Sequence, residues 1–319
     1  MRSRVITIIG VVVSVVCVVG VVYWAVHQPA PKFPSDAGHL LLVAAAVGLY
    51  GLNTLVRSER WHRLIVQDGG TPDRIDSYAL TVVGYTGNNI LPARAGDAVR
   101  VLLMAPRAGT TRATLVGTLV AERLLDVVVI VVLFVVVGYG VLGEVSGGKA
   151  ELIGVVTVAV LLAAVATVWF IRRNQRLHDF FAPLMTSTLA LISGHGAGLV
   201  AMTFLIWLLE TFVWMTVGAS AGFDMSIIEG LYLVALASIF SLIPSGPAYA
   251  GTQDTAAITG IKAIGGTSSL ATTYLILLRF VLQVPITIFG LVLLAARYGG
   301  ISKLRRARLE EVSATGSSS

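Results

Sequence analysis

Long runs without a charged residue constrain this chain more than any other feature. Four such runs, 5–26, 38–56, 127–143 and 152–171, are each about as long as the ~20 residues that cross the hydrocarbon core of a bilayer as a helix. Two further apolar stretches, 197–222 and 267–296, contain one charge each, Glu210 and Arg279. The chain is therefore predicted to be an all-α integral membrane protein.

The composition supports this class. Hydrophobic residues make up 56% of the chain and charged residues 13%, and the mean hydropathy is +0.85, all far from an average soluble domain. The run 5–26 is longer than the apolar core of a signal peptide, and no Ala-x-Ala cleavage site follows it, so it is predicted to be the first transmembrane helix. No nucleic-acid partner is expected, because the basic residues behind the net charge of +6 lie in alternate loops, as membrane orientation requires.

Basic residues are concentrated in alternate loops, and this placement predicts the orientation. They precede the first run, follow the second, and recur near 107–112, at 172–176 and in the tail at 297–308. The intervening loops contain only Lys32, Lys149 and Lys262. The positive-inside rule then places the chain in the cytoplasmic membrane with both termini in the cytoplasm.

Two polar segments, 88–100 and 242–254, interrupt the apolar pattern. The residues predicted to break their helices are Pro92, Gly96, Pro244, Pro247 and Gly251. Irregular backbone inside a bilayer is tolerated only where protein or water satisfies its amides and carbonyls. Paired interruptions at matching places in two halves are a pointer to the binding site of a transporter, so the functional site is expected at these segments.

The orientation rule predicts how the broken segments enter the membrane. Because Arg74 and Arg107 must lie on one side, 77–106 is expected to form a re-entrant hairpin, and 226–265 a second one from the opposite side. Each half would then contain three transmembrane helices and one hairpin, in an inverted repeat of 1–149 and 150–308, followed by a disordered tail at 309–319. Ser226 and Glu229 predict a capping box at the start of the second hairpin. The alternative is that both interruptions are ordinary connections between full-length helices.

Ionisable residues at membrane depth are few and recur with the same spacing in the two halves. Asp97 precedes Arg123 by 26 residues, and Asp254 precedes Arg279 by 25. Charges at the centre of a membrane helix are costly, and they usually mark a partner, a pathway or a ligand. One interpretation is that each arginine pairs with the nearby aspartate and attaches a hairpin to the following helix.

The functional interpretation is that the arginines also bind an anionic group. Arg94, Arg100, Arg123 and Arg279 facing one cavity would present forks of donors that match phosphate oxygens. Glu210 would balance that charge, or bind a cation or a proton. The full set of candidate substrate-binding residues is Asn89, Arg94, Asp97, Arg100, Glu122, Arg123, Asp126, Glu210, Ser245, Tyr249, Asp254 and Arg279.

Three further expectations concern the remaining polar residues. Glu122 and Asp126 lie four apart and are predicted to share one face of a helix. The stretch Arg57, Arg60, Trp61 and Arg63 is predicted to lie at the cytoplasmic boundary, as a helix anchor or as a platform that gathers anionic lipids. No catalytic residue, metal site or cofactor is expected, because the five histidines lack metal-ligand spacing.

These motifs resemble a known family. The first region reads Arg60-Trp61, then Asn89-x-Leu91-Pro92-x-Arg94-x-Gly96-Asp97-x-x-Arg100, then Glu122-Arg123-x-x-Asp126. The second reads Pro244-Ser245-x-Pro247-x-Tyr249-x-Gly251-Thr252, followed by Arg279 and Pro285. In this order, over nearly the whole chain, they resemble the flippase-like transmembrane domain of lysylphosphatidylglycerol synthases.

The resemblance implies movement of an aminoacylated phospholipid, or of another polar lipid, from the inner to the outer leaflet. The chain departs from the full synthases in one respect: it ends shortly after its last predicted helix, so their soluble aminoacyl-transferase domain, and with it lipid aminoacylation, is not expected. Two positions depart from the family pattern: Asp254 stands where similar proteins usually have glutamate, and Ala248 where they often have glycine.

The predicted function is therefore a lipid translocase whose partner is a membrane phospholipid or another lipid-linked substrate. Two alternatives stay open. One is an accessory membrane protein that binds lipid, a lipid-modifying enzyme or a second copy of itself without moving anything. The other is a transferase that acts on a polyprenyl-phosphate lipid, with carboxylates as general base and an arginine as phosphate clamp.

Overall fold

The computed structural model describes residues 23, 33, 35–91, 94–142, 194–241, 248 and 251–300, with the backbone alone at 134–142 and 194–195. Every regular element in these ranges is an α-helix, as predicted. The helices are α2 (Ala37–Gln67), α3 (Arg74–Ile90), α4 (Ala95–Met104), α5 (Arg112–Leu142), α8 (Gly194–Ser220), α9 (Ile227–Phe240), α10 (Thr252–Ala263) and α11 (Ser268–Tyr298). Apart from residue 23, the predicted helix at 5–26 lies outside the described residues, as do the predicted helix at 152–171, the boundary between the halves and the tail.

Three of the described helices are long and apolar enough to cross a membrane. They are α2 with 31 residues, the part Gly196–Ser220 of α8 with 25, and α11 with 31. They coincide with the runs predicted at 38–56, 197–222 and 267–296. Large side chains such as Leu41, Val292 and Ile288 are mostly exposed on these helices, as expected for surfaces that face lipid. The chain is a membrane protein.

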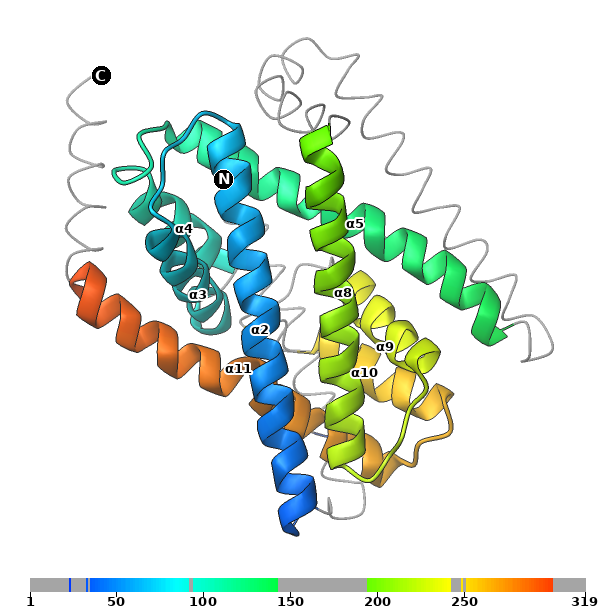
Figure 1. The fold of residues 1–319 in the computed structure, drawn as a ribbon. Helices are drawn as coiled ribbons and strands as arrows, with labels where there is room; N and C mark the ends of the chain where they lie inside the picture. The colour runs from blue at the N-terminus through cyan, green and yellow to red at the C-terminus, as the bar shows by residue number, and fades with distance from the viewer. Residues whose placement is uncertain are drawn as a thin grey trace.

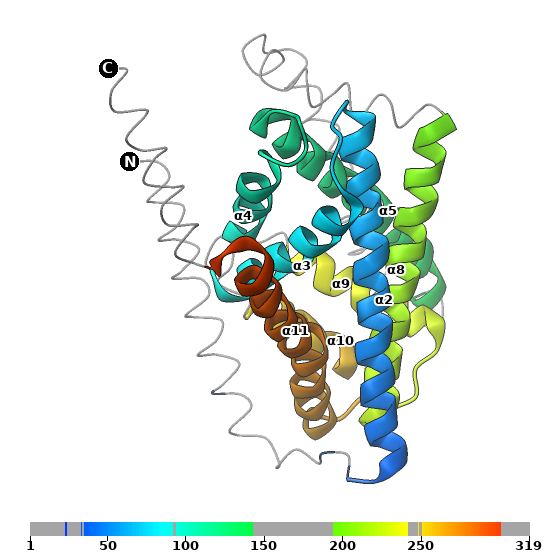
Figure 2. The same cartoon turned by 60° about the vertical axis from the view of Figure 1, so that its left-hand side comes forward.

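Helices α2 and α8 run side by side in opposite directions along the length of the molecule (Figures 1 and 2). Their contact is partly polar, because Asn53 of α2 donates a hydrogen bond of 2.5 Å to Glu210 of α8. Next to it, Trp214 of α8 belongs to the main apolar core, and its carbonyl accepts a hydrogen bond from the Tyr274 hydroxyl of α11 at 3.2 Å. The core thus joins all three candidate spans.

Helices α3 and α4 form an antiparallel pair that begins and ends at the same end of the molecule. The amide of Thr71, before α3, donates to the carbonyl of Ala108, after α4, at 2.8 Å. The two helices approach closely through glycines, since a Cβ at Gly87 would lie 2.6 Å from the Cα of Gly96. The two helices have only 17 and 10 residues, fewer than the ~20 that span a bilayer.

Helices α9 and α10 form a second pair of short helices, with 14 and 12 residues. The capping box predicted at the start of α9 is confirmed: the amide of Ser226 donates to Glu229 at 2.7 Å, and the amide of Glu229 donates to the Ser226 hydroxyl at 3.3 Å. Leu233 of α9 packs directly over Gly260 of α10. The pair lies in the main apolar core, against α8 and α11.

Helix α11 crosses from the second pair to the first (Figure 1). Thr86 of α3 donates to the carbonyl of Ile286 at 3.0 Å, over a close approach at Gly290 where the nearest atoms belong to Thr86 and Val82. At its end, the hydroxyl of Tyr298 donates to Asp76, in the first turn of α3, at 2.8 Å. One helix of the second half therefore holds the helix pair of the first half.

Three of the four named residues in the stretch 57–63 lack the exposure expected of a helix anchor or a lipid-gathering platform. Helix α2 continues to Gln67, so the stretch lies inside the helix. Arg60 and Trp61 are fully buried, at 1% and 0% exposure, and the indole of Trp61 donates to Thr118 at 3.0 Å. Only the Arg63 side chain, 54% exposed, fits the role of a surface anchor.

The glycine contact between α3 and α4 yields a testable prediction. A Cβ at Gly96 would collide with backbone atoms of Gly84 and Asn88, which cannot move away as a side chain could. Gly96→Ala should therefore lower the free energy of unfolding by about 1–3 kcal/mol. Thermal unfolding in detergent would measure the loss.

The matched control is Gly51→Ala on α2, where no atom lies within 4 Å of the added Cβ. Because alanine is favoured over glycine inside a helix by roughly 0.5–1 kcal/mol, this variant should be neutral or slightly more stable. Equal effects of the two substitutions would contradict the packing assigned to α3 and α4.

Candidate functional site

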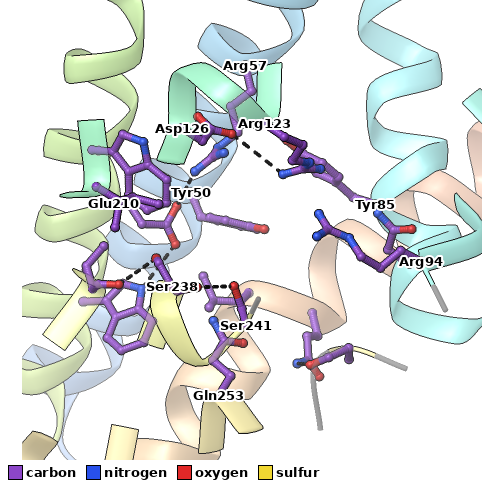
Figure 3. Close-up of a pocket in the computed structure, with 18 of the residues that line it drawn as sticks. Tyr50, Arg57, Tyr85, Arg94, Arg123, Asp126, Glu210, Ser238, Ser241 and Gln253 are labelled. Atoms are coloured by element: carbon purple, nitrogen blue, oxygen red, sulfur yellow. Dashed lines mark hydrogen bonds and ion pairs between the residues drawn. The ribbon is translucent and has the colours of Figure 1, made fainter. Parts of the chain in front are cut away.

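A cavity of about 280 Å³ lies where the open ends of the two helix pairs meet (Figure 3). Its wall includes Asn88 and Asn89 from the end of α3 and Arg94 from the start of α4. The second pair contributes Ser238 and Ser241 from the end of α9, and Ala248 and Gln253 near the start of α10. Helices α3 and α9 also contribute Tyr85 and Val234. The remaining lining residues come from α2, α5, α8 and α11, and they are Tyr50, Arg57, Arg123, Asp126, Val127, Ile130, Trp207, Glu210, Trp214, Leu282 and Gln283.

The backbone is strained at both places where a helix pair is broken. Within the described ranges, Arg94 and Ala248 are the non-glycine residues with a positive φ, and both have φ 55°. L-residues rarely adopt this left-handed conformation, because the Cβ crowds the following carbonyl. Gly251, immediately before α10, has φ 89°, which glycine accepts without this cost. The predicted break residues Pro92, Pro244 and Pro247 lie outside the described residues, as do the candidate ligand residues Ser245 and Tyr249.

The two aspartates occupy equivalent positions at the start of α4 and α10. Asp97 is the third residue of α4 and Asp254 the third of α10. Asp254 accepts hydrogen bonds from the Gly251 amide at 2.8 Å and from Arg279 Nε at 2.7 Å. Asp97 accepts from Asn88 at 3.1 Å and lies 3.7 Å from Arg123. Both aspartate–arginine pairs predicted from the spacing are thus present.

Arg279 was expected to face the cavity and does not line it. Its guanidinium is turned to Asp254, with Nη2 at 2.5 Å from Oδ1, and Nη1 donates to Gln283 at 3.2 Å and to the carbonyl of Ala248 at 3.5 Å. These contacts hold the strained residue and the start of α10 against α11. Because its donors are directed at these groups, Arg279 supports the wall, while Gln283 and Ala248 form it.

Arg100 was also expected in the cavity and is instead part of the interior. Its side chain is 1% exposed, its guanidinium lies 3.9 Å from the centre of the Trp61 ring, and it forms an ion pair of 3.3 Å with Glu122. Such a stacked arginine gains cation–π attraction. Arg60, equally buried, holds Asp126 at 2.7 Å and Glu122 at 3.7 Å. Glu122 and Asp126 therefore share a face as predicted.

Arg94 and Arg123 remain as the predicted arginines that line the cavity. Their side chains are 36% and 39% exposed, compared with 2% for Arg60. Figure 3 shows both side chains extending towards the open part of the site, with Tyr85 beside Arg94. Arg123 lies 3.8 Å from Asp126 and Arg94 lies 3.8 Å from Asp97. These two arginines can exchange a carboxylate contact for a ligand.

Arg57 is a cavity residue that the sequence analysis assigned elsewhere. It lies 3.4 Å from Glu210 and 5.3 Å from the centre of the Trp207 ring. A signal was available: Asn53, Arg57 and Arg60 follow each other by four and three residues, so they form a polar stripe on one face of α2 that continues beyond the apolar run. A polar stripe on a membrane helix faces protein or a cavity.

Glu210, the remaining predicted acid, is fully engaged. One carboxylate oxygen accepts from Asn53 at 2.5 Å and lies 3.4 Å from Arg57, and the other accepts from Trp214 at 3.2 Å. Asn89, also predicted, lines the cavity and donates to Thr287 at 3.0 Å. Asn89 thus attaches the end of α3 to α11.

The charges in and behind the cavity wall do not cancel. Five arginines face four carboxylates among the described residues of this network: Arg57, Arg60, Arg94, Arg100 and Arg123 against Asp97, Glu122, Asp126 and Glu210. The network therefore carries one formal positive charge, and its more exposed arginines lie on the cavity side. Such a site can bind a single negative charge.

The buried part of this network yields a second prediction. Arg60→Ala would leave Asp126 and Glu122 without their shared partner, and each of these two side chains is only 6% exposed. The expected loss in free energy of unfolding is about 3–5 kcal/mol. Arg63→Ala, three residues later and exposed, removes the same charge and should cost about 0–1 kcal/mol. Comparable thermal shifts for the two variants in detergent would refute the structural role of Arg60.

Comparison with known proteins supports the resemblance of the motifs. No curated protein and no solved structure matches the chain. Residues 7–290 match the family described as the lysylphosphatidylglycerol synthase TM region. Because this match covers most of the 319 residues, the chain belongs to the lysylphosphatidylglycerol synthase TM region family.

Proposed function

We propose that this protein is a lipid translocase that moves a phosphate-bearing lipid between the leaflets of the cytoplasmic membrane, without catalysing a reaction on it. The observation that carries the proposal is the position of Arg57, Arg94 and Arg123. They come from α2, the start of α4 and α5, and all three line one cavity among helices that are long enough to cross a membrane. Family membership supports a lipid-related role.

The chemistry of the wall suits a phosphate. A guanidinium binds phosphate oxygens through two parallel donors, and such charge-assisted bonds are among the strongest hydrogen bonds in proteins. Arg94 and Gln253 lie at the amino ends of α4 and α10, and both line the cavity. The positive ends of two helix dipoles therefore add to the attraction for an anion.

A translocase also needs two halves that can move relative to each other, and the proposed architecture provides them. The proposal is that α3–α4 and α9–α10 are re-entrant hairpins from opposite sides, in an inverted repeat with broken helices at mid-membrane. Their short lengths, their equivalent aspartates and their positive-φ breaks support this arrangement. The antiparallel course of α2 and α8 agrees with it, because α2 precedes the first hairpin and α8 precedes the second (Figure 2).

In the proposed mechanism the head group enters the cavity while the acyl chains remain in lipid. Arg94 and Arg123 exchange contacts with Asp97 and Asp126 for the phosphate, so the desolvation of the anion is offset. Relative movement of the two repeats then opens the site to the other leaflet. Arg279 and Arg60 keep the helix pairs attached during this movement.

The proposal predicts that removing a cavity arginine slows transport without unfolding the protein. Arg94→Gln and Arg123→Gln should each slow movement of a fluorescent phospholipid in liposomes at least about tenfold, because each removes charge-assisted hydrogen bonds worth about 1.5–3 kcal/mol. Accessibility of the label to a membrane-impermeant quencher measures the movement.

Arg63→Gln is the matched control, since it removes an equal charge from an exposed position. It should transport normally, and thermal unfolding should confirm that all three variants fold. If folded Arg94→Gln and Arg123→Gln move lipid at the rate of the unchanged protein, the translocase proposal fails at this cavity.

The proposed orientation has its own test. In a Cys17→Ser background, Thr71→Cys before α3 should be protected from an impermeant maleimide added outside cells, whereas Asp224→Cys before α9 should be labelled. Both positions are exposed, and the positive-inside rule places the first in the cytoplasm. Lysed cells, in which both cysteines should react, provide the control. Labelling of Thr71→Cys alone in intact cells would reverse the orientation.

A further inference from the structure

We infer that α11 is a hinged connection between the two helix pairs and that it bends at Pro285. The part of α11 before this residue moves with the second pair, α9–α10, and the part after it moves with the first pair, α3–α4. The inference deepens the proposed function and rests on it in one respect, because the bend would open and close the cavity as a lipid passes.

A proline weakens α11 at one point. Pro285 is an interior residue of this helix, which runs from Ser268 to Tyr298. Proline has no backbone N–H, so the carbonyl of Val281 loses its hydrogen bond, and the ring crowds the same turn. Sharp bends in helices occur mostly at such positions, and membrane helices tolerate them. Among the helices that the structure describes, α11 is the one that contains an interior proline.

The first part of α11 is attached to the second helix pair. Arg279 donates to Asp254 of α10 at 2.7 Å. Arg279 and Gln283 also donate to the carbonyl of Ala248, which precedes α10, both at 3.5 Å. The buried residues of this part belong to the main apolar core, with residues of α8, α9 and α10, and they are Ala271, Tyr274, Leu275, Leu277, Leu278 and Val281. The last residue of α11 that packs in this core is Leu282.

The second part of α11 is attached to the first helix pair. Thr86 of α3 donates to the carbonyl of Ile286 at 3.0 Å. One residue later, Thr287 accepts a hydrogen bond from Asn89 of α3, also at 3.0 Å. The end of the helix packs in a second apolar core with residues of α3 and α4, through Leu293, Leu294 and Tyr298. The partners of α11 thus change from one helix pair to the other within a single turn, and the proline lies in that turn.

The hinge lies at the wall of the cavity. Leu282 and Gln283, directly before Pro285, line the cavity. Asn89 lines it too, and it is held by Thr287, directly after the proline. A bend at Pro285 therefore changes the separation between the parts of the wall that contain Gln283 and Asn89. Figure 1 shows the course of α11 from the second pair to the first.

Helices α2 and α5 provide the continuous side of the hinge. Both contribute residues to the main core and to the second core, but neither contains a proline. The buried ion pair of Arg60 with Asp126 joins them at 2.7 Å. Two bodies that stay joined on one side and separate on the other undergo a hinge movement. The side that contains Pro285 is then the side that opens.

The bend is measurable as a distance between two spin labels on α11, one on each side of Pro285. In a Cys17→Ser background, Ile276→Cys and Val292→Cys place labels at positions that are 43% and 57% exposed. They lie 16 residues apart, about 24 Å along a straight helix. The control pair is Ile75→Cys on α3 with Val292→Cys, because both positions belong to the first body. In vesicles of phosphatidylethanolamine and phosphatidylglycerol, the pair across the proline should have a distance distribution at least about twice as wide as the control pair.

Three variants connect the bend to lipid movement. Pro285→Ala restores the missing N–H, so it should narrow the distribution to the width of the control pair and slow movement of a fluorescent phospholipid in liposomes at least about fivefold. Pro285→Gly keeps a weak point in the helix and should retain at least about half of the rate. Val284→Ala, at an exposed neighbouring position, shortens a side chain without changing the backbone and should move lipid normally. Thermal unfolding in detergent confirms that the variants fold.

The outcomes separate the hinge from the proposed function. Equal widths for the two label pairs overturn the inference, and so does an unchanged width, or an unchanged rate of lipid movement, in folded Pro285→Ala. Pro285→Gly that moves lipid as slowly as Pro285→Ala also overturns it. In all these cases the translocase proposal stands if the unchanged protein moves lipid. If the labels report the bend and the unchanged protein moves no phospholipid, the proposed function fails and the hinge itself is confirmed.

Discussion

The buried contact of Arg60 with Asp126 and Glu122 is the interaction on which the rest of the site depends. A guanidinium that is 1% exposed inside a membrane protein persists only if carboxylates pair with it. This requirement attaches α2 to α5, and Glu122 extends the attachment to Arg100 of α4 at 3.3 Å. The first helix pair is thereby fixed against two long helices before any ligand is considered. The arginines that remain can then face the cavity.

Exposure separates the arginines that build the site from those that can bind a ligand. Arg60 and Arg100 are at most 2% exposed, whereas Arg94 and Arg123 exceed a third. Helix geometry explains how neighbours in the sequence divide between the two roles. Arg94 precedes α4, where the strained break turns its side chain towards the cavity, and Arg100 lies more than one turn later, on the face that packs against α3.

Local features of this site could be predicted from the sequence, whereas the contacts that bury some arginines and expose others could not. The apolar runs, the capping box and the spacing of acid to arginine are local patterns, and the structure confirms three of the runs, the capping box and both aspartate–arginine pairs. The face of a short helix that meets another segment depends on distant residues, so the interior position of Arg100 against Trp61 could not be predicted from spacing alone. Arg57 was assigned to a boundary because the apolar run ends at Val56, although helix α2 continues to Gln67.

The two aspartate–arginine pairs occupy corresponding helix positions but differ in exposure, and this difference explains which groups form the cavity wall. Asp254 is 8% exposed and bound by Arg279 at 2.5 Å, whereas Asp97 is 23% exposed and lies 3.7 Å from Arg123. A short, enclosed pair leaves neutral groups such as Gln253 to form the wall. A longer, more exposed pair leaves a guanidinium at the surface of the cavity. The first half consequently contributes the arginines of the cavity wall, and the second half contributes neutral groups such as Gln253 together with the carboxylate of Glu210.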